Sequence, residues 1–142
     1  MTKFLTDLQK KLVALTRDLI LIPSDESRPD DIERCFEFII NHLESLDTVV
    51  IKKHYHRGIT SLVVLSKNMD HPKVLLCGHL DVITHSDSHC YRSHITDGKI
   101  IGPGSGDMKG PLAVLLEVFM DLHTKYDNLP LGLAITSDEE RG

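Results

Sequence analysis

The stretch VLLCGHLD, residues 74–81, places a short apolar run directly before a histidine and an aspartate. The strand expected over residues 73–77 is of the apolar kind that lies in the middle of a sheet covered on both faces. Binding sites in open α/β sheets lie beyond the carboxyl ends of strands, where His79 and Asp81 fall. Side chains two positions apart in a strand point the same way, so Asp81 can reach the His79 ring and fix its tautomer. The same pair is also common at surface strand ends, so it does not decide the function alone.

Apolar residues on either side of this stretch recur with helical or strand spacing. They predict helices over 4–21, 29–46 and 111–122, strands over 48–54, 60–65 and 131–136, and a hairpin over 95–101. This order predicts an α/β fold, a three-layer sandwich whose mixed, mostly parallel sheet has helices on both faces. At 142 residues the chain is one domain or one piece of a domain.

Composition and charge exclude several classes of protein. The formal net charge is −5, whereas a nucleic-acid partner would require a basic face. Lys, Asp or His interrupts the longest apolar runs within about ten residues, which is too short for a membrane span. The charged start of the chain lacks the apolar block of a signal peptide. Three cysteines without Cys-x-x-Cys spacing predict neither a disulfide framework nor a zinc–cysteine site, and they favour the reducing cytoplasm.

A second motif, IGPGSGDMKG at residues 101–110, is called the glycine loop below. Glycines let a backbone approach a ligand closely, and a carboxylate such as Asp107 can bridge two metal ions roughly 3.5–4 Å apart. A phosphate cradle would also use glycines, but the Walker spacing is absent, and so is Gly-x-Gly-x-x-Gly running from a strand directly into a helix. A plain turn that caps the helix is the other alternative, and we favour the metal-binding interpretation. Lys109 is expected to pair with nearby carboxylates.

A third motif, SDEE at residues 137–140, follows the strand expected over 131–136. Of two adjacent glutamates, one can bind a metal ion while its neighbour takes a proton from water. A solvated acidic loop is the alternative, and it would be preferred if the motif stood alone. Taken together, one imidazole and several carboxylates suit zinc or a similar divalent metal.

These three motifs, together with LIPS at residues 21–24, resemble those of the acetylornithine deacetylase, succinyl-diaminopimelate desuccinylase and glutamate carboxypeptidase family of di-zinc hydrolases. Their order and spacing agree over nearly the whole chain. The resemblance implies that His79 binds one metal ion, that Asp81 orients His79, and that Asp107 bridges both ions. It further implies that Glu139 is the general base and Glu140 a ligand of the second ion. A cis peptide bond after Asp107 is also implied.

The resemblance thus predicts a hydrolase that uses two zinc ions, or cobalt, to cleave an amide bond in a small peptide or N-acyl amino acid with a free carboxylate. Residues 1–142 would be the N-terminal portion of one catalytic domain, without its C-terminal half and dimerisation domain. The full-length form is expected to be a homodimer. Each ion would find two protein ligands here, so we expect weak or no metal retention. A sheet that ends after residues 131–136 could also expose a strand edge and associate.

Two other functions stay open at this stage. One is a catalytically inactive piece that acts structurally or complements another chain. The other is a nucleotide-binding α/β module, an interpretation that depends on the glycines of residues 101–110 alone.

Overall fold

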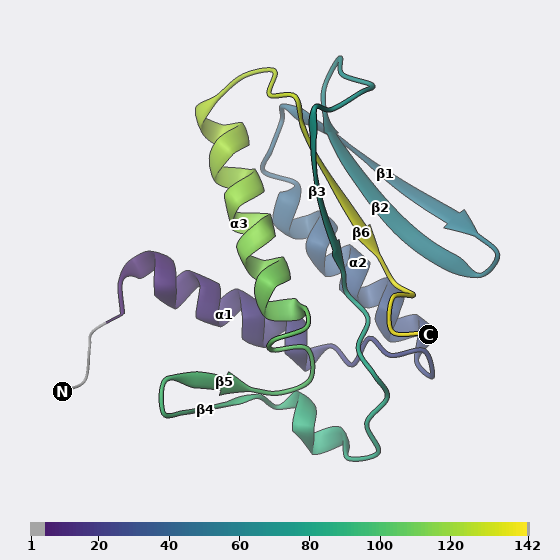
Figure 1. Cartoon of the computed structure of the whole chain (residues 1–142), viewed down its shortest axis with the longest axis vertical. Helices are drawn as coiled ribbons and strands as arrows, with labels where there is room; N and C mark the ends of the chain where they lie inside the picture. The colour runs from purple at the N-terminus through teal and green to yellow at the C-terminus, as the bar shows by residue number, and fades with distance from the viewer. Residues whose placement is uncertain (1–4, 142) are drawn as a thin grey trace.

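The computed structural model describes residues 5–141 and shows a four-stranded sheet, three long helices and a small separate hairpin (Figure 1). In spatial order, the strands of the sheet are β1 (Val49–His56), β2 (Ile59–Ser66), β6 (Leu131–Thr136) and β3 (Val74–His79). β2 is antiparallel to both of its neighbours, whereas β3 runs parallel to β6. The separate hairpin consists of β4 (His94–Thr96) and β5 (Lys99–Ile101).

Of the three predicted helices, one begins at its predicted residue 29 and one at residue 109, two residues before its predicted start. The third begins at residue 7, and its predicted start at residue 4 lies outside the described residues. The helices are α1 (Asp7–Leu21), α2 (Pro29–Leu43), α3 (Lys109–Lys125) and a short 3-10 helix, η1 (Ser88–Tyr91). α1 starts with a capping box, in which the Thr6 and Gln9 side chains each accept a hydrogen bond from the other residue's backbone N–H. α2 has Pro29 in its first turn, where a missing N–H costs nothing. Among the described residues, no helix has the length and apolar character that crossing a bilayer requires.

Two tight turns close the predicted hairpins. Arg57 and Gly58 join β1 to β2, and Asp97 and Gly98 join β4 to β5. All four residues have positive φ, between 48° and 85°. This backbone geometry matches the twist of the flanking strands in two-residue hairpin turns. The hairpin predicted over 95–101 is therefore confirmed, and the strands expected over 48–54 and 60–65 also form an antiparallel hairpin.

One hydrophobic core joins all three helices to one face of the sheet. Its members include Phe36 of α2, Leu116 of α3, Leu62 of β2 and Leu133 of β6, none of which is exposed to solvent. Burial of a side chain of this size contributes roughly 1.5–3 kcal/mol to stability. The alternate residues of β2 that point away from the core, such as Val63, are only half-buried. The helices and the sheet thus form a single frame that carries the loops at its end.

The predicted α/β class and mixed sheet are confirmed, but two details differ within residues 5–141. Two of the three strand pairings are antiparallel, and the helices share a core with one face of the sheet instead of covering both. A sequence pattern shows which residues suit burial, but it does not show on which side of a sheet a helix packs. The pattern for 131–136 was interpreted correctly, because β6 is central.

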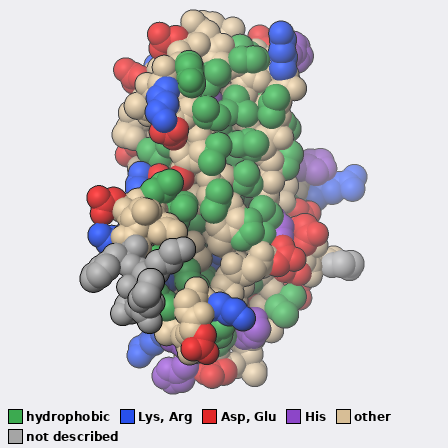
Figure 2. Space-filling model, turned by 60° about the vertical axis from the view of Figure 1, so that its left-hand side comes forward, with side chains coloured by type: hydrophobic (Ala, Val, Ile, Leu, Met, Phe, Trp, Pro, Cys, Tyr) green, Lys and Arg blue, Asp and Glu red, His purple; other side chains and the backbone are tan. Residues whose placement is uncertain are grey.

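β3 was expected in the middle of the sheet and lies at its edge. It pairs only with β6 in the described part of the chain, and its residues Val74 and Leu75 are about half exposed. An apolar run indicates that a strand suits burial, but it carries no information about which segment covers it. Further apolar side chains are exposed along α3, including Val114 and Val118, and Figure 2 shows a face on which hydrophobic side chains gather. Both β1 and β3 are edge strands of the sheet among the described residues, and β3 is the edge that carries the exposed apolar side chains of Val74 and Leu75.

Candidate metal centre

The parallel strands β3 and β6 end at the same edge of the sheet. Their register pairs His79 with Thr136, the last residue of each strand. The next residue of the first motif continues this pairing, because the Leu80 N–H donates to the Thr136 carbonyl at 3.0 Å. The motifs at residues 79–81 and 137–140 therefore leave the sheet side by side.

His79 lies at the centre of the site. Its side chain is almost wholly buried, and its Nε2 is 3.2 Å from Asp107 Oδ1 and 3.7 Å from Glu139 Oε2. One ligand atom from each of His79, Glu139 and Glu140 lies within 4.8 Å of the other two. The structure thus brings together the imidazole and the three carboxylates that the sequence singled out. One imidazole with several carboxylates is a donor set that suits zinc.

Asp81 connects the first motif with the third. Its carboxylate is 2% exposed, and its Oδ2 accepts a hydrogen bond from the Glu140 N–H at 2.9 Å. Its Oδ1 lies 3.4 Å from His79 Nδ1 and makes no hydrogen bond to a described residue. The backbone carbonyl of Asp81 is the nearer contact of Nδ1, at 3.1 Å. Asp81 therefore reaches the His79 ring as expected, through two oxygens, and also holds the backbone at Glu140.

The glycine loop brings Asp107 to the other side of the His79 ring. The Asp107–Met108 peptide bond is cis, which confirms the geometry that the resemblance implied. The Met108 sulfur accepts a hydrogen bond from the His79 N–H at 3.2 Å. Gly78 leaves room for this contact, because a Cβ there would lie 2.9 Å from Met108 Cε. The loop and β3 therefore touch directly.

Among the described residues, Lys109 forms no ion pair with a carboxylate, contrary to the prediction. Its side chain is fully buried, and its Nζ donates to the carbonyls of Leu19 at 2.9 Å and Ile22 at 2.6 Å. Burial lowers the pKa of the Lys109 amine to about 8. The carbonyls at the end of a helix lack partners within the helix, so they are ready acceptors for a nearby amine. Lys109 therefore attaches the glycine loop to the end of α1.

Asp25 was missed by the sequence reasoning. It is fully buried and accepts hydrogen bonds from Tyr91 Oη at 3.0 Å and from the Ser27 N–H at 3.0 Å, and it forms an ion pair with Arg28 at 2.8 Å. Burial alone would raise its pKa, but the hydrogen bonds from Ser27 and Tyr91 bring the pKa below the ordinary value for aspartate. Tyr91 is 66 residues away in the chain, so no spacing rule could have identified this contact.

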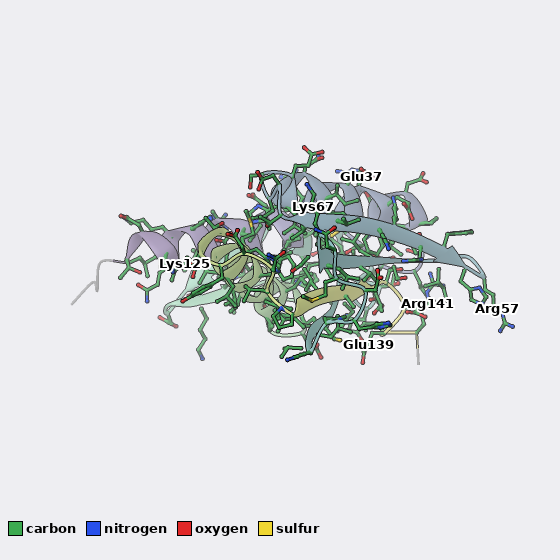
Figure 3. The ribbon with its side chains drawn as sticks, turned by 90° about the horizontal axis from the view of Figure 1, so that it is seen from above. Glu37, Arg57, Lys67, Lys125, Glu139 and Arg141 are labelled. Carbon is green, nitrogen blue, oxygen red and sulfur yellow. The ribbon has the colours of Figure 1, made fainter. Side chains whose placement is uncertain are left out.

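The site has a buried half and an open half. The side chains of His79 and Asp81 are less than a tenth exposed, whereas that of Glu139 is 60% and that of Asp107 81% exposed. A cavity of about 220 Å³ lies beside it, lined by residues that include Asp81, Glu140 and Arg141. Figure 3 shows Glu139 and Arg141 on the side of the molecule opposite to Glu37 of α2. A ligand could therefore approach the exposed carboxylates from solvent.

Comparison with known proteins gives matches in sequence and in structure. The sequence model of the family described as "Peptidase family M20/M25/M40" matches residues 75–142. Succinyl-diaminopimelate desuccinylase of Sulfurimonas denitrificans is 31% identical over 123 residues, which cover 84% of this chain and 32% of that protein. Acetylornithine deacetylase of Yersinia pestis is 27% identical over 142 residues, which cover 90% of this chain and 36% of that protein. The chain thus spans about a third of the length of these relatives.

Solved structures show the same fold. Human carnosine dipeptidase 1 superposes with a TM-score of 0.76 at 21% identity, over 94% of this chain and 33% of that protein. The metallo-carboxypeptidase Sso-CP2 of Sulfolobus solfataricus superposes with a TM-score of 0.74 at 19% identity, over 92% of this chain and 31% of that protein. At these identities the superpositions show a shared fold alone. The evidence for a relationship between this chain and known proteins comes from the sequence matches.

Proposed function

Because residues 75–142 match peptidase family M20/M25/M40, we propose that this chain belongs to that family and contributes the described site to a metal-dependent hydrolase that cleaves an amide bond. The observation that carries the proposal is the convergence of one imidazole and three carboxylates from two strand ends and the glycine loop. Motifs about thirty residues apart in sequence would not meet in this way if each were an independent surface loop. In this proposal, residues 1–142 are the N-terminal portion of a catalytic domain that acts in the cytoplasm.

The proposed roles follow from the positions of the side chains. His79 and Asp107 would hold one zinc ion, and Asp107 and Glu140 a second, with cobalt as a possible substitute. A bound zinc ion would polarise the amide carbonyl and lower the pKa of a water molecule. Asp81, buried against Nδ1 of His79, would keep Nε2 directed at the ion. These assignments explain why Nδ1 of His79 faces the buried Asp81, whereas Nε2 faces the exposed carboxylates of Asp107 and Glu139.

Glu139 would act as the general base. Its side chain is mostly exposed and has no fixed hydrogen-bond donor among the described residues except the nearby His79 ring, so it is free to accept a proton. It would take a proton from the attacking water as the new C–O bond forms. It would then deliver this proton to the amine nitrogen as the C–N bond breaks.

The substrate class follows from the relatives. Their names describe a succinylated and an acetylated amino acid, and the structural neighbours include a dipeptidase and a carboxypeptidase. We therefore propose a small peptide or an N-acyl amino acid with a free carboxylate. A homodimer of the full-length form remains part of the proposal.

Hydrolysis assays with added zinc or cobalt test the function. N-succinyl-diaminopimelate, N-acetylornithine and a simple dipeptide would be offered to the chain and to its Glu139→Ala variant. Loss of a general base should lower the rate by about 10²–10⁴-fold. Glu44→Ala, which removes an exposed glutamate at the end of α2, is the matched control and should keep the full rate. Equal rates for the unmodified chain and Glu139→Ala would contradict the proposal and favour the inactive piece.

A further inference from the structure

We propose that Lys109 is a positioning residue, which fixes Asp107 relative to His79 by attaching the glycine loop to the turn that follows α1. This turn, residues 19–25, comprises the end of α1 and the residues that follow it. It would support both the glycine loop, which carries Asp107, and the end of β3, which carries His79. The inference rests on the proposed function, since it concerns residues assigned there to the metal site.

The first contact of this support is the buried amine. Lys109 is not exposed at all, and Nζ donates to two carbonyls, those of Leu19 and Ile22. α1 ends at Leu21, and each of these carbonyls also accepts one backbone hydrogen bond, from the N–H of Ile22 or of Ser24, so the amine is a second donor to both. A cation at this end also interacts favourably with the helix dipole. The lysine therefore has a specific partner 87–90 residues earlier in the chain.

The glycine loop is shaped around the lysine stem. Gly104 has φ of +74°, and a Cβ there would lie 3.0 Å from Lys109 Cγ and 2.8 Å from Val82 Cγ1. The Gly110 N–H donates to the Gly104 carbonyl at 3.2 Å, which closes the loop on itself. Displacement of the stem would therefore displace the backbone on both sides of Asp107.

The same turn holds the end of β3. Ser24 Oγ donates to the Leu80 carbonyl at 2.6 Å, and the Val82 N–H donates to the Ser24 carbonyl at 3.0 Å. Two hydrogen bonds thus fix the backbone immediately after His79. Lys109 and Ser24 together set the distance between the two segments through one short piece of chain.

Asp107 has little other support. Its carboxylate is mostly exposed, and its only polar side-chain contact within residues 5–141 is His79. Besides this contact, the His79 N–H donates to the Met108 sulfur, and a thioether is a weak acceptor. The position of Asp107 therefore depends chiefly on the attachment of its loop.

Substitution of Lys109→Met tests this inference, because it keeps the apolar stem and removes the amine. The readouts are the affinity for Co²⁺, from an absorption titration with excess metal, and amide hydrogen exchange over residues 101–110 without metal. We expect Co²⁺ binding to weaken by about 10–100-fold, the usual cost of losing a group that orients metal ligands. Exchange in the loop should become faster while that of β6 stays unchanged. Lys125→Met, an exposed position on the same helix, should match the unmodified chain in both.

A stability-matched variant separates positioning from general destabilisation. Leu43→Ala removes a fully buried side chain in the last turn of α2 and should lower stability without weakening Co²⁺ binding. An equal loss of affinity in Leu43→Ala, or unchanged affinity in Lys109→Met, would overturn the inference. If Lys109→Met does not fold, Ser24→Ala removes the other contact and should weaken Co²⁺ binding several-fold. Failure of the unmodified chain to bind Co²⁺ even in excess metal would count against the proposed metal site, and amide exchange over residues 101–110 in Lys109→Met would then decide the inference by itself.

Discussion

Replacement of Gly110 by alanine tests a single close backbone contact in the glycine loop. A Cβ on Gly110 would lie 2.2 Å from the Ser105 carbonyl oxygen, and real Cβ atoms essentially never come closer than 3.0 Å to such an atom. The carbonyl must therefore retreat by about 0.8 Å (3.0 minus 2.2 Å). It is part of the main chain, so it cannot rotate away as a flexible side chain would. The retreat would move the loop that carries Asp107.

The expected cost combines two opposing effects. Steric overpacking in a well-packed region typically costs about 1–3 kcal/mol. The higher helix propensity of alanine, at the start of α3, offsets up to about 1 kcal/mol of this. We therefore expect Gly110→Ala to lower the free energy of unfolding by about 1–2 kcal/mol. Urea unfolding followed by circular dichroism should show a lower midpoint with an unchanged slope.

Gly106 offers a matched control in the same loop. A Cβ at Gly106 would meet nothing within 4 Å, so Gly106→Ala should change the free energy of unfolding by no more than about 0.5 kcal/mol. A Co²⁺ titration of both variants adds a second measurement, in which only Gly110→Ala should bind more weakly. Equal stabilities for the two variants would refute the reasoning from the Ser105 contact.

Two further predictions concern groups outside the site. Burial lowers the pKa of His123, with the Leu131 backbone acting in the opposite direction. The unfolded chain therefore binds a proton that the folded chain resists, so the free energy of unfolding should fall as the pH drops below about 6.5. His123→Leu should remove up to about 1.4 kcal/mol per pH unit of this slope in urea unfolding, and an unchanged slope would contradict the assignment. The open edge of β3 should make the chain associate with rising concentration, and Val74→Lys should weaken this association in sedimentation velocity, whereas a concentration-independent monomer would argue against it.

The elements that the sequence predicted correctly are those with local signals. A capping box starts α1, a first-turn proline starts α2, and residue pairs with positive φ close the two hairpins. Each signal lies within a few residues of the structure that it predicts. The edge position of β3 and the cover on one face of the sheet have no such signal, because they depend on which distant segments pack together.

The features of the site also separate into those with local sequence signals and those that depend on distant contacts. His79, Asp107 and Glu140 could be selected from sequence because each follows a strand or precedes a helix, and those ends converge by topology. The first motif lies at the end of β3 and the third follows β6. Because these strands are parallel neighbours, the two motifs meet at one edge of the sheet. What the sequence could not supply is the set of contacts that hold these residues in place.

Those contacts join segments that are far apart in the chain. Lys109 reaches Leu19 across 90 residues, and Ser24 reaches Leu80 across 56. In sequence, a lysine two residues after an aspartate indicates charge pairing, and only the packed structure shows that the carbonyls of Leu19 and Ile22 are its acceptors. A fully buried amine without such acceptors would be strongly destabilising, so its position is constrained as tightly as that of a ligand. The residues of this site could therefore be predicted from local motifs, whereas the contacts that hold them depend on residues 19–25, to which the sequence pattern assigned no role in the site.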